Sequence, residues 1–319
     1  MDPFPPGSEQ SHSLGLSRWG HNGTGPEAAM PSTQYRHIIE RFHAWACEQP
    51  GVRAVLIVGS QARTTTPADE WSDLDLVLFV TNPEELLESG DWVNHFGSVV
   101  LTMVETTGLG VGKERRVLYS DGRDVDFSVY PAVALGLIAE HPEALRVLGR
   151  GSQVLLDKDG LLARLSSLVA TVAGRPRPKP SAKEYLDCVN DFWYHVLWTA
   201  KKLRRGEVWI AKMCCDGYLK QRLLRMVEWE ALAESKGQAD VWHDGRFLDR
   251  WAPPEVRARL PSTFAQYDRL DVARALAETS RLFSDQAHGV AETWGFVYPQ
   301  DTESDVQALA RGTLRDLGP

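Results

Sequence analysis

The sequence lacks the features that would place the protein in a membrane, among exported disulfide-rich proteins or among metal-finger proteins. No apolar run is long enough to cross a bilayer, and the first residues form neither a basic start nor the apolar segment of an export signal. There are only four cysteines, and none are spaced as CxxC or as in metal fingers. We therefore expect a cytoplasmic protein with reduced thiols and no membrane partner.

The sequence also lacks a basic stripe of the kind that binds nucleic acid. Its net charge is −8 at pH 7, and Lys and Arg are not gathered in one obvious region. An acidic balance favours a cationic small molecule over a polyanion as the substrate. We expect no nucleic-acid partner, and either a monomer or a weak homodimer.

The composition of the chain and the positions of its proline-rich and glycine-rich segments predict two folded domains. With 319 residues, of which 43% are hydrophobic, the chain is long enough for two separate cores. Residues 1–31 are rich in Gly, Pro and Ser without periodicity, which predicts a disordered N-terminal extension. Residues 175–181 alternate proline with basic residues and predict a stiff linker. The domains are then residues 32–174 and 182–312.

The first domain combines strand and helix signals, and the second has helical spacing. Strands are predicted at residues 54–58, 74–80, 98–105, 115–120, 124–130 and 153–156. Helices are predicted from Ser32 or Thr33 to about Glu48, over 83–95, from Pro131 onward and over 161–172. The fold class is therefore α+β: an N-terminal α/β domain with a mixed sheet and helices, followed by a C-terminal α-helical domain.

The most informative stretch contains two carboxylates between two apolar strands. Asp73 and Asp75 stand where the strand 74–80 begins, and residues two apart in an extended chain point to the same face. Carboxylates that point together repel each other unless a cation holds them, and oxygen ligands suit Mg²⁺. The turn at Gly59 and Ser60 offers backbone N–H groups and a hydroxyl that can hold a phosphate nearby.

Two further residues are candidates for this site. Asp126 lies on a strand that follows the turn signal Asp121-Gly122, and it is the first choice for a third carboxylate. Asp124 shares its face and is the alternative. Arg63 could bind the same phosphate oxygens as Ser60 through its forked guanidinium, although loop arginines are often only surface charge.

The helix expected over residues 182–204 has two contrasting sides. One side carries an apolar stripe, made of Val189, Trp193, Val196, Ala200 and Leu203. The opposite side carries charged and aromatic residues, namely Asp187, Asp191, Tyr194, Trp198 and Lys201. This second side could line a cleft, where Lys201 binds phosphate and the acids and rings bind a cationic substrate. It could equally be a helix packed on both sides, with the charges at its rim.

The first motif resembles a known superfamily. Gly59-Ser60-x-Ala62-Arg63 followed by Ser72-Asp73-x-Asp75 is similar to the signature of the nucleotidyltransferase fold typified by DNA polymerase β. The resemblance implies that the Gly-Ser turn grips the phosphates of a nucleotide. It also implies that Asp73 and Asp75 bind two Mg²⁺ ions, and that a third carboxylate, here Asp126, completes the site.

The second half of the chain resembles a narrower family, the streptomycin (aminoglycoside 6-) adenylyltransferases. The similar segments are Pro180-Ser181-Ala182, Cys188-x-Asn190-Asp191-Phe192-Trp193, Ala200-Lys201 and Leu223-Leu224-Arg225-Met226-x-x-Trp229. The family transfers AMP from Mg-ATP to a hydroxyl of an aminoglycoside and releases pyrophosphate. The resemblance implies nucleotide binding at Gly59, Ser60 and Lys201, and it suggests Asp126, or else Asp191, as the base that deprotonates the hydroxyl. Gln61 and Met213 stand where the family often has Arg and Asp.

Two other functions share the first motif. One is a nucleotidyltransferase of the antitoxin type that modifies a protein or RNA acceptor, in which the helical partner domain carries Arg and, a few residues later, His. Arg281 and His288 have such a spacing, but Leu282 follows the Arg where a polar residue is usual. The other is a nucleotide-binding module without activity, which would normally have lost one of the three carboxylates.

Overall fold

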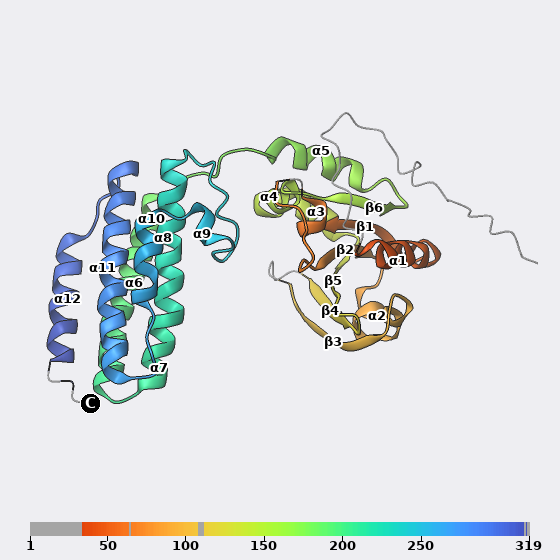
Figure 1. Ribbon diagram of the computed structural model, residues 1–319. Helices are drawn as coiled ribbons and strands as arrows, with labels where there is room; N and C mark the ends of the chain where they lie inside the picture. The colour runs from red at the N-terminus through yellow and green to blue at the C-terminus, as the bar shows by residue number, and fades with distance from the viewer. Residues whose placement is uncertain (1–33, 64, 108–111, 316, 318–319) are drawn as a thin grey trace, which may run out of the picture. The chain divides into compact units, whose positions relative to one another are not determined.

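The computed structural model divides the chain into two compact units, one ending at Gly174 and the other beginning at Arg175 (Figure 1). The described residues are 34–63, 65–107, 112–315 and 317. The extension predicted for residues 1–31 therefore lies outside the described residues. Each unit has hydrophobic core clusters of its own.

The first unit is built on a six-stranded mixed sheet with the order β3-β4-β5-β2-β1-β6. The strands are β1 (Val52–Val58), β2 (Leu74–Val80), β3 (Val99–Thr106), β4 (Lys113–Tyr119), β5 (Asp124–Pro131) and β6 (Gln153–Asp157). Strands β2 and β5 pair in parallel, and the other neighbouring pairs are antiparallel. The six predicted strands are thus confirmed, with ends that differ by no more than two residues.

Helices cover both faces of this sheet, which explains why most residues of β1 and β2 are apolar. The elements on one face are α1 (Arg36–Glu48), α2 (Pro83–Glu88) and the 3₁₀ helix η2 (Asp91–His95), and those on the other are α3 (Ala134–Glu140), α4 (Pro142–Gly149) and α5 (Leu162–Val172). Alternate residues of β1 point to opposite faces. Val55 and Ile57 pack with α1, whereas Ala54 and Leu56 pack with α3, α4 and α5.

Three helix predictions in this unit were wrong in detail. The first described helix begins at Arg36, after the predicted caps Ser32 and Thr33, which lie outside the described residues. Residues 83–95 form two short helices instead of one, because the chain is extended at Ser89. Pro131 does not open a helix. It ends β5, and the ladder with β2 continues through a bond from Ala132 N to the carbonyl of Val80 (2.7 Å), so α3 starts later.

The second unit consists of helices and connecting loops, with no strand among its described residues. Its elements are α6 (Ala182–Arg204), α7 (Val208–Met213), the π-helix η3 (Cys214–Tyr218), α8 (Leu219–Glu234), α9 (Leu248–Trp251), α10 (Pro254–Thr263), α11 (Arg269–Trp294) and α12 (Gln300–Leu314). Ser181 and Glu184 form a capping box that fixes the start of α6. The rings of Phe192 and Phe283 stack 3.6 Å apart and join α6 to α11. The predicted α+β fold class, with a helical C-terminal domain, is confirmed.

Candidate active site

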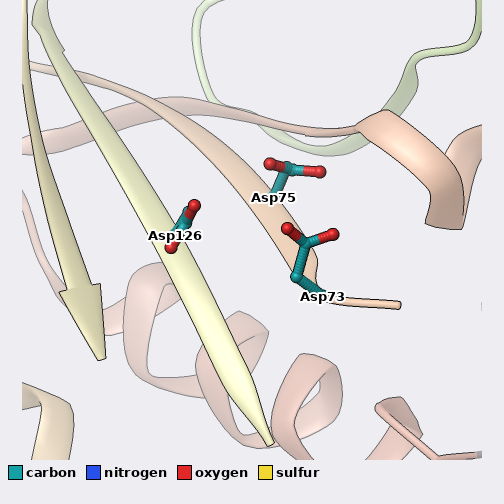
Figure 2. A group of neighbouring side chains, drawn as sticks. All are labelled: Asp73, Asp75 and Asp126. Carbon is teal, nitrogen blue, oxygen red and sulfur yellow. The ribbon is translucent and has the colours of Figure 1, made fainter. Parts of the chain in front are cut away.

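Three carboxylates meet on one face of the sheet in the first unit. Asp73 immediately precedes β2, Asp75 belongs to β2, and Asp126 belongs to β5 (Figure 2). One oxygen from each side chain lies within 4.8 Å of the others. The parallel register places Asp75 directly opposite Asp126, so the structure brings the predicted trio together. The alternative, Asp124, is exposed and accepts a hydrogen bond from the hydroxyl of Tyr35 instead (3.4 Å).

The position of the trio follows from the alternation of β2. Asp75 and Phe79 point to the same face, because residues two and four apart in a strand share a face. Phe79 is fully buried in the core beneath α3, α4 and α5. Asp75 stands at the other end of the strand and is only partly buried. The carboxylates therefore lie at the edge of a core, where they are partly desolvated and still accessible to a ligand.

The electrostatics of the trio favour a bound cation. Burial raises the pKa of Asp75 to about 7, and the charges of Asp73 and Asp126 add to this effect. Burial also raises the pKa of Asp126 to about 7, with a further contribution from Glu114. Crowded carboxylates in a partly desolvated place are costly when ionised, and a divalent cation would remove that cost. Three carboxylates supply the hard oxygen ligands that suit Mg²⁺.

Gly59 makes room for this arrangement. It follows β1 and opens the 3₁₀ helix η1 (Gly59–Ala62) with φ of +68°, a conformation that favours glycine. A Cβ atom at this position would lie 1.8 Å from Oδ2 of Asp75. The sequence indicated a phosphate-binding turn at Gly59, but it did not show that this glycine also fits against a carboxylate of the trio.

The residues after Gly59 present groups suited to a phosphate. Ser60 is only 4% exposed, and its Oγ is buried without a hydrogen-bond partner among the described residues. A buried hydroxyl normally has a partner, so Ser60 fits the predicted contact with a ligand oxygen. Arg63 is 7% exposed, and its positive charge opposes the rise in the pKa of Asp75. Arg63 is therefore not the surface charge that its loop position allowed.

Arg116 and Glu114 on β4 lie near the trio, and the sequence did not indicate them as site residues. Arg116 is the register partner of Asp126, and its Nε lies 3.6 Å from Oδ2 of that residue. The same nitrogen lies 2.7 Å from Glu105 Oε1 and 3.0 Å from Glu114 Oε1. Counting outward from the hairpin turn at Asp121 would have placed Arg116 opposite Asp126. The pattern of charges along β4 alone gives no such signal.

Comparison with known proteins identifies the family. The model of the streptomycin adenylyltransferase family matches residues 33–312. The chain belongs to this family. It is therefore a nucleotidyltransferase, as the sequence motifs indicated.

Relatives of the chain are named aminoglycoside 6-adenylyltransferase. The relative from Bacillus subtilis is 24% identical over 84% of this chain and 94% of its own length. The relative from Campylobacter jejuni is 25% identical over 78% of this chain and 85% of its own length. A solved structure of the aminoglycoside 6-adenyltransferase from Bacillus subtilis covers 88% of this chain and all of its own chain, at 21% identity and a TM-score of 0.44.

The predicted site residues on α6 belong to the second unit of this nucleotidyltransferase. The predicted apolar stripe is buried, namely Val189, Trp193, Val196, Ala200 and Leu203. On the opposite stripe, Tyr194 and Lys201 are exposed, and Trp198 is partly buried against the helical core. Asp187 is exposed and pairs with Lys183 (2.5 Å). Within this unit the stripe is thus a rim of accessible charges and rings.

Asp191 has partners that the sequence did not predict. The hydroxyl of Tyr218 lies 2.9 and 2.8 Å from its two oxygens. Arg222 Nε lies 2.7 Å from Oδ2, and His195 Nδ1 lies 3.1 Å from Oδ1. Tyr218 ends the π-helix η3, a rare element that is often found at functional sites. Both oxygens of Asp191 are thus contacted by other side chains of the second unit.

The two residues whose spacing suggested an antitoxin partner both contact acidic side chains of the second unit. Arg281 pairs with Glu278. His288 lies 3.5 Å from the buried Glu303, and its ring is 3.9 Å from that of Tyr298.

Of the helices in the described ranges, none is long and apolar enough to cross a membrane.

Proposed function

We propose that the protein transfers AMP from Mg-ATP to a hydroxyl of a streptomycin-like aminoglycoside and releases pyrophosphate, an activity that confers antibiotic resistance. The observation that supports this most is the trio of Asp73, Asp75 and Asp126, whose oxygens lie within 4.8 Å of one another. The buried hydroxyl of Ser60, which has no hydrogen-bond partner among the described residues, stands on the adjoining turn. The names of the relatives support an aminoglycoside as acceptor.

The trio would hold the metal ions, and the turn would bind the phosphates of the nucleotide. Asp73, Asp75 and Asp126 would hold two Mg²⁺ ions, which when bound neutralise the triphosphate and the leaving pyrophosphate. The backbone at Gly59 and the hydroxyl of Ser60 bind phosphate oxygens, in agreement with the absence of a partner for this hydroxyl in the described part of the chain. Arg63 adds a buried positive charge beside these groups.

The reaction forms one bond and breaks another at the α-phosphorus. The acceptor oxygen attacks this atom, the bond to pyrophosphate breaks, and the hydroxyl proton passes to a carboxylate. Asp126 is the first choice for this base, because it belongs to the trio near which the acceptor hydroxyl would lie. Asp191 is the second choice, since Arg222 and Tyr218 already hold its oxygens.

The second unit would supply the acceptor side of the reaction. Asp187, Asp191, Tyr194 and Trp198 present acids and rings that suit the ammonium and guanidinium groups of an aminoglycoside. Lys201 is exposed at the same side of α6 and would contribute to phosphate binding. The net charge of −8 agrees with a cationic acceptor. A cytoplasmic location and a monomeric or weakly dimeric state remain predictions.

The experiment that tests the proposal is a comparison of acceptors. The full chain is incubated with Mg-ATP and a panel of aminoglycosides, and the products are analysed by mass spectrometry and by release of pyrophosphate. We expect one aminoglycoside to gain the mass of one AMP residue. Pyrophosphate release that requires a protein or RNA acceptor instead would favour the antitoxin type of nucleotidyltransferase.

A further inference from the structure

An additional carboxylate lies close to the trio and is held by other residues. Glu114 is opposite Ser128 in the β4–β5 ladder, two residues from Asp126 on the same face. After burial, the charge of Glu114 is the largest cause of the raised pKa of Asp126, and the same charge contributes to the raised pKa of Asp75. Glu114 is therefore near enough to the trio to influence it strongly.

Both oxygens of Glu114 have a partner. Oε2 accepts a hydrogen bond from the hydroxyl of Ser128 (2.7 Å). Oε1 accepts a hydrogen bond from Nε of Arg116 (3.0 Å). The side chain of Glu114 is only 15% exposed, so its ionised carboxylate depends on these two contacts.

Arg116 is in turn fixed by acids on three strands. Its Nε contacts Glu105 on β3 and Glu114 on β4, and it lies 3.6 Å from Asp126 on β5. One guanidinium therefore stands between a carboxylate of the trio and a fourth carboxylate.

We propose that Arg116 is a positioning residue that holds Glu114 away from the trio and so limits the metal site to three carboxylates. The inference rests on the proposed metal site. Diagonal neighbours on adjacent strands are close enough for long side chains to interact, and without Arg116 no described residue would hold Oε1 of Glu114. A fourth carboxylate would suit Ca²⁺, which takes more oxygen ligands than Mg²⁺ and tolerates irregular geometry. Arg116 thereby determines which divalent cation the site prefers.

The test compares the affinities of Ca²⁺ and Mg²⁺ for the full chain without nucleotide. Each ion competes with Mn²⁺, whose free concentration is measured by electron paramagnetic resonance. Removing a positive charge alone strengthens the binding of both divalent ions equally, whereas a new ligand changes their ratio. In Arg116→Gln, we expect the ratio of Ca²⁺ to Mg²⁺ affinity to rise about tenfold.

A second variant decides whether Glu114 is responsible. In the double variant Arg116→Gln, Glu114→Gln, the ratio should return to that of the parent, because the added ligand is gone. Arg53→Gln is the matched control, since Arg53 also pairs with an acid, Asp159, at the opposite edge of the sheet. Its ratio should equal that of the parent.

The outcomes that contradict the inference are distinct from failure of the proposed function. An unchanged ratio in Arg116→Gln, or a raised ratio that persists in the double variant, would overturn the role of Arg116 while the metal site stands. A parent protein that binds none of the three ions would overturn the metal site and this inference together. Melting temperatures of all variants show that each is folded.

Discussion

Replacing Gly59 by alanine tests whether the glycine turn and the carboxylate trio form one unit. The φ of Gly59 is +68°, a conformation that costs an alanine about 1–2 kcal/mol. The new Cβ would also lie 1.8 Å from Oδ2 of Asp75, where ordinary contact begins at 3.4 Å. The carboxylate of Asp75 must therefore move by about 1 Å or more, which separates it from Asp73 and Asp126.

The backbone strain and the displacement of Asp75 are detected by different measurements. The backbone cost lowers the free energy of unfolding, which denaturant titration measures. The displacement of Asp75 weakens Mn²⁺ binding and slows AMP transfer, because a misplacement of about 1 Å in a catalytic site can reduce the rate about a hundredfold. We expect Gly59→Ala to lose about 1–2 kcal/mol of stability and to lose most of its transfer activity.

Gly160→Ala is the matched control for Gly59→Ala. Gly160 has almost the same φ, +67°, but a Cβ there meets nothing within 4 Å. It should lose similar stability and keep the metal affinity and transfer rate of the parent. Transfer by Gly59→Ala at the rate of Gly160→Ala would refute the close fit between the turn and Asp75.

Three further substitutions test other residues of the two units. Asp75→Asn should abolish transfer without lowering the melting temperature, because it removes a metal ligand and relieves like-charge repulsion; activity within about tenfold of the parent would mean that the metal site is elsewhere. Asp191→Asn should weaken acceptor binding about ten- to a hundredfold and leave ATP affinity unchanged in calorimetry, whereas loss of turnover with intact binding would make Asp191 the base. Burial and neighbouring carboxylates raise the pKa of Glu230 to about 7. The folded protein therefore holds this proton more tightly than the unfolded chain, and the stability that this gives at low pH is lost as the pH rises through 7. Glu230→Gln should therefore be about 1–3 kcal/mol more stable than the parent at pH 8, with little gain near pH 4.5; an equal gain at both pH values, or the same gain in the exposed Glu292→Gln, would contradict this assignment.

Local signals in the sequence were sufficient for most of the fold. The strands around Asp75 and Asp126 were predictable, because apolar runs bounded by turn residues have few alternatives to burial in a sheet. Helix α6 was predictable from its apolar stripe and from Ser181 at its start. Pro131 misled because proline is favoured at the first position of a helix, but it can also stand at the end of a strand where the ladder does not need its missing N–H. Only the pairing with β2 decides between them.

The candidate site was predictable where its residues are close in sequence or share a strand alternation. Asp73 and Asp75 satisfy both conditions. Partners on other strands or helices were harder to predict. Arg116 reaches Asp126 through the β4–β5 register, which only counting from the turn at Asp121 would have given. Arg222 reaches Asp191 from α8, and no local pattern encodes that contact, because it depends on the tertiary arrangement.

AMP transfer to an aminoglycoside is tested most sharply with ATP labelled at the α-phosphate. The full chain is incubated with Mg²⁺, the labelled ATP and streptomycin, and the label is followed into antibiotic, protein and nucleic-acid fractions. We expect the label to enter the antibiotic with one pyrophosphate released for each AMP transferred, and neither to occur with Asp73→Asn. Label in a protein or RNA fraction, or in the antibiotic at an equal rate with Asp73→Asn, would contradict the proposed reaction.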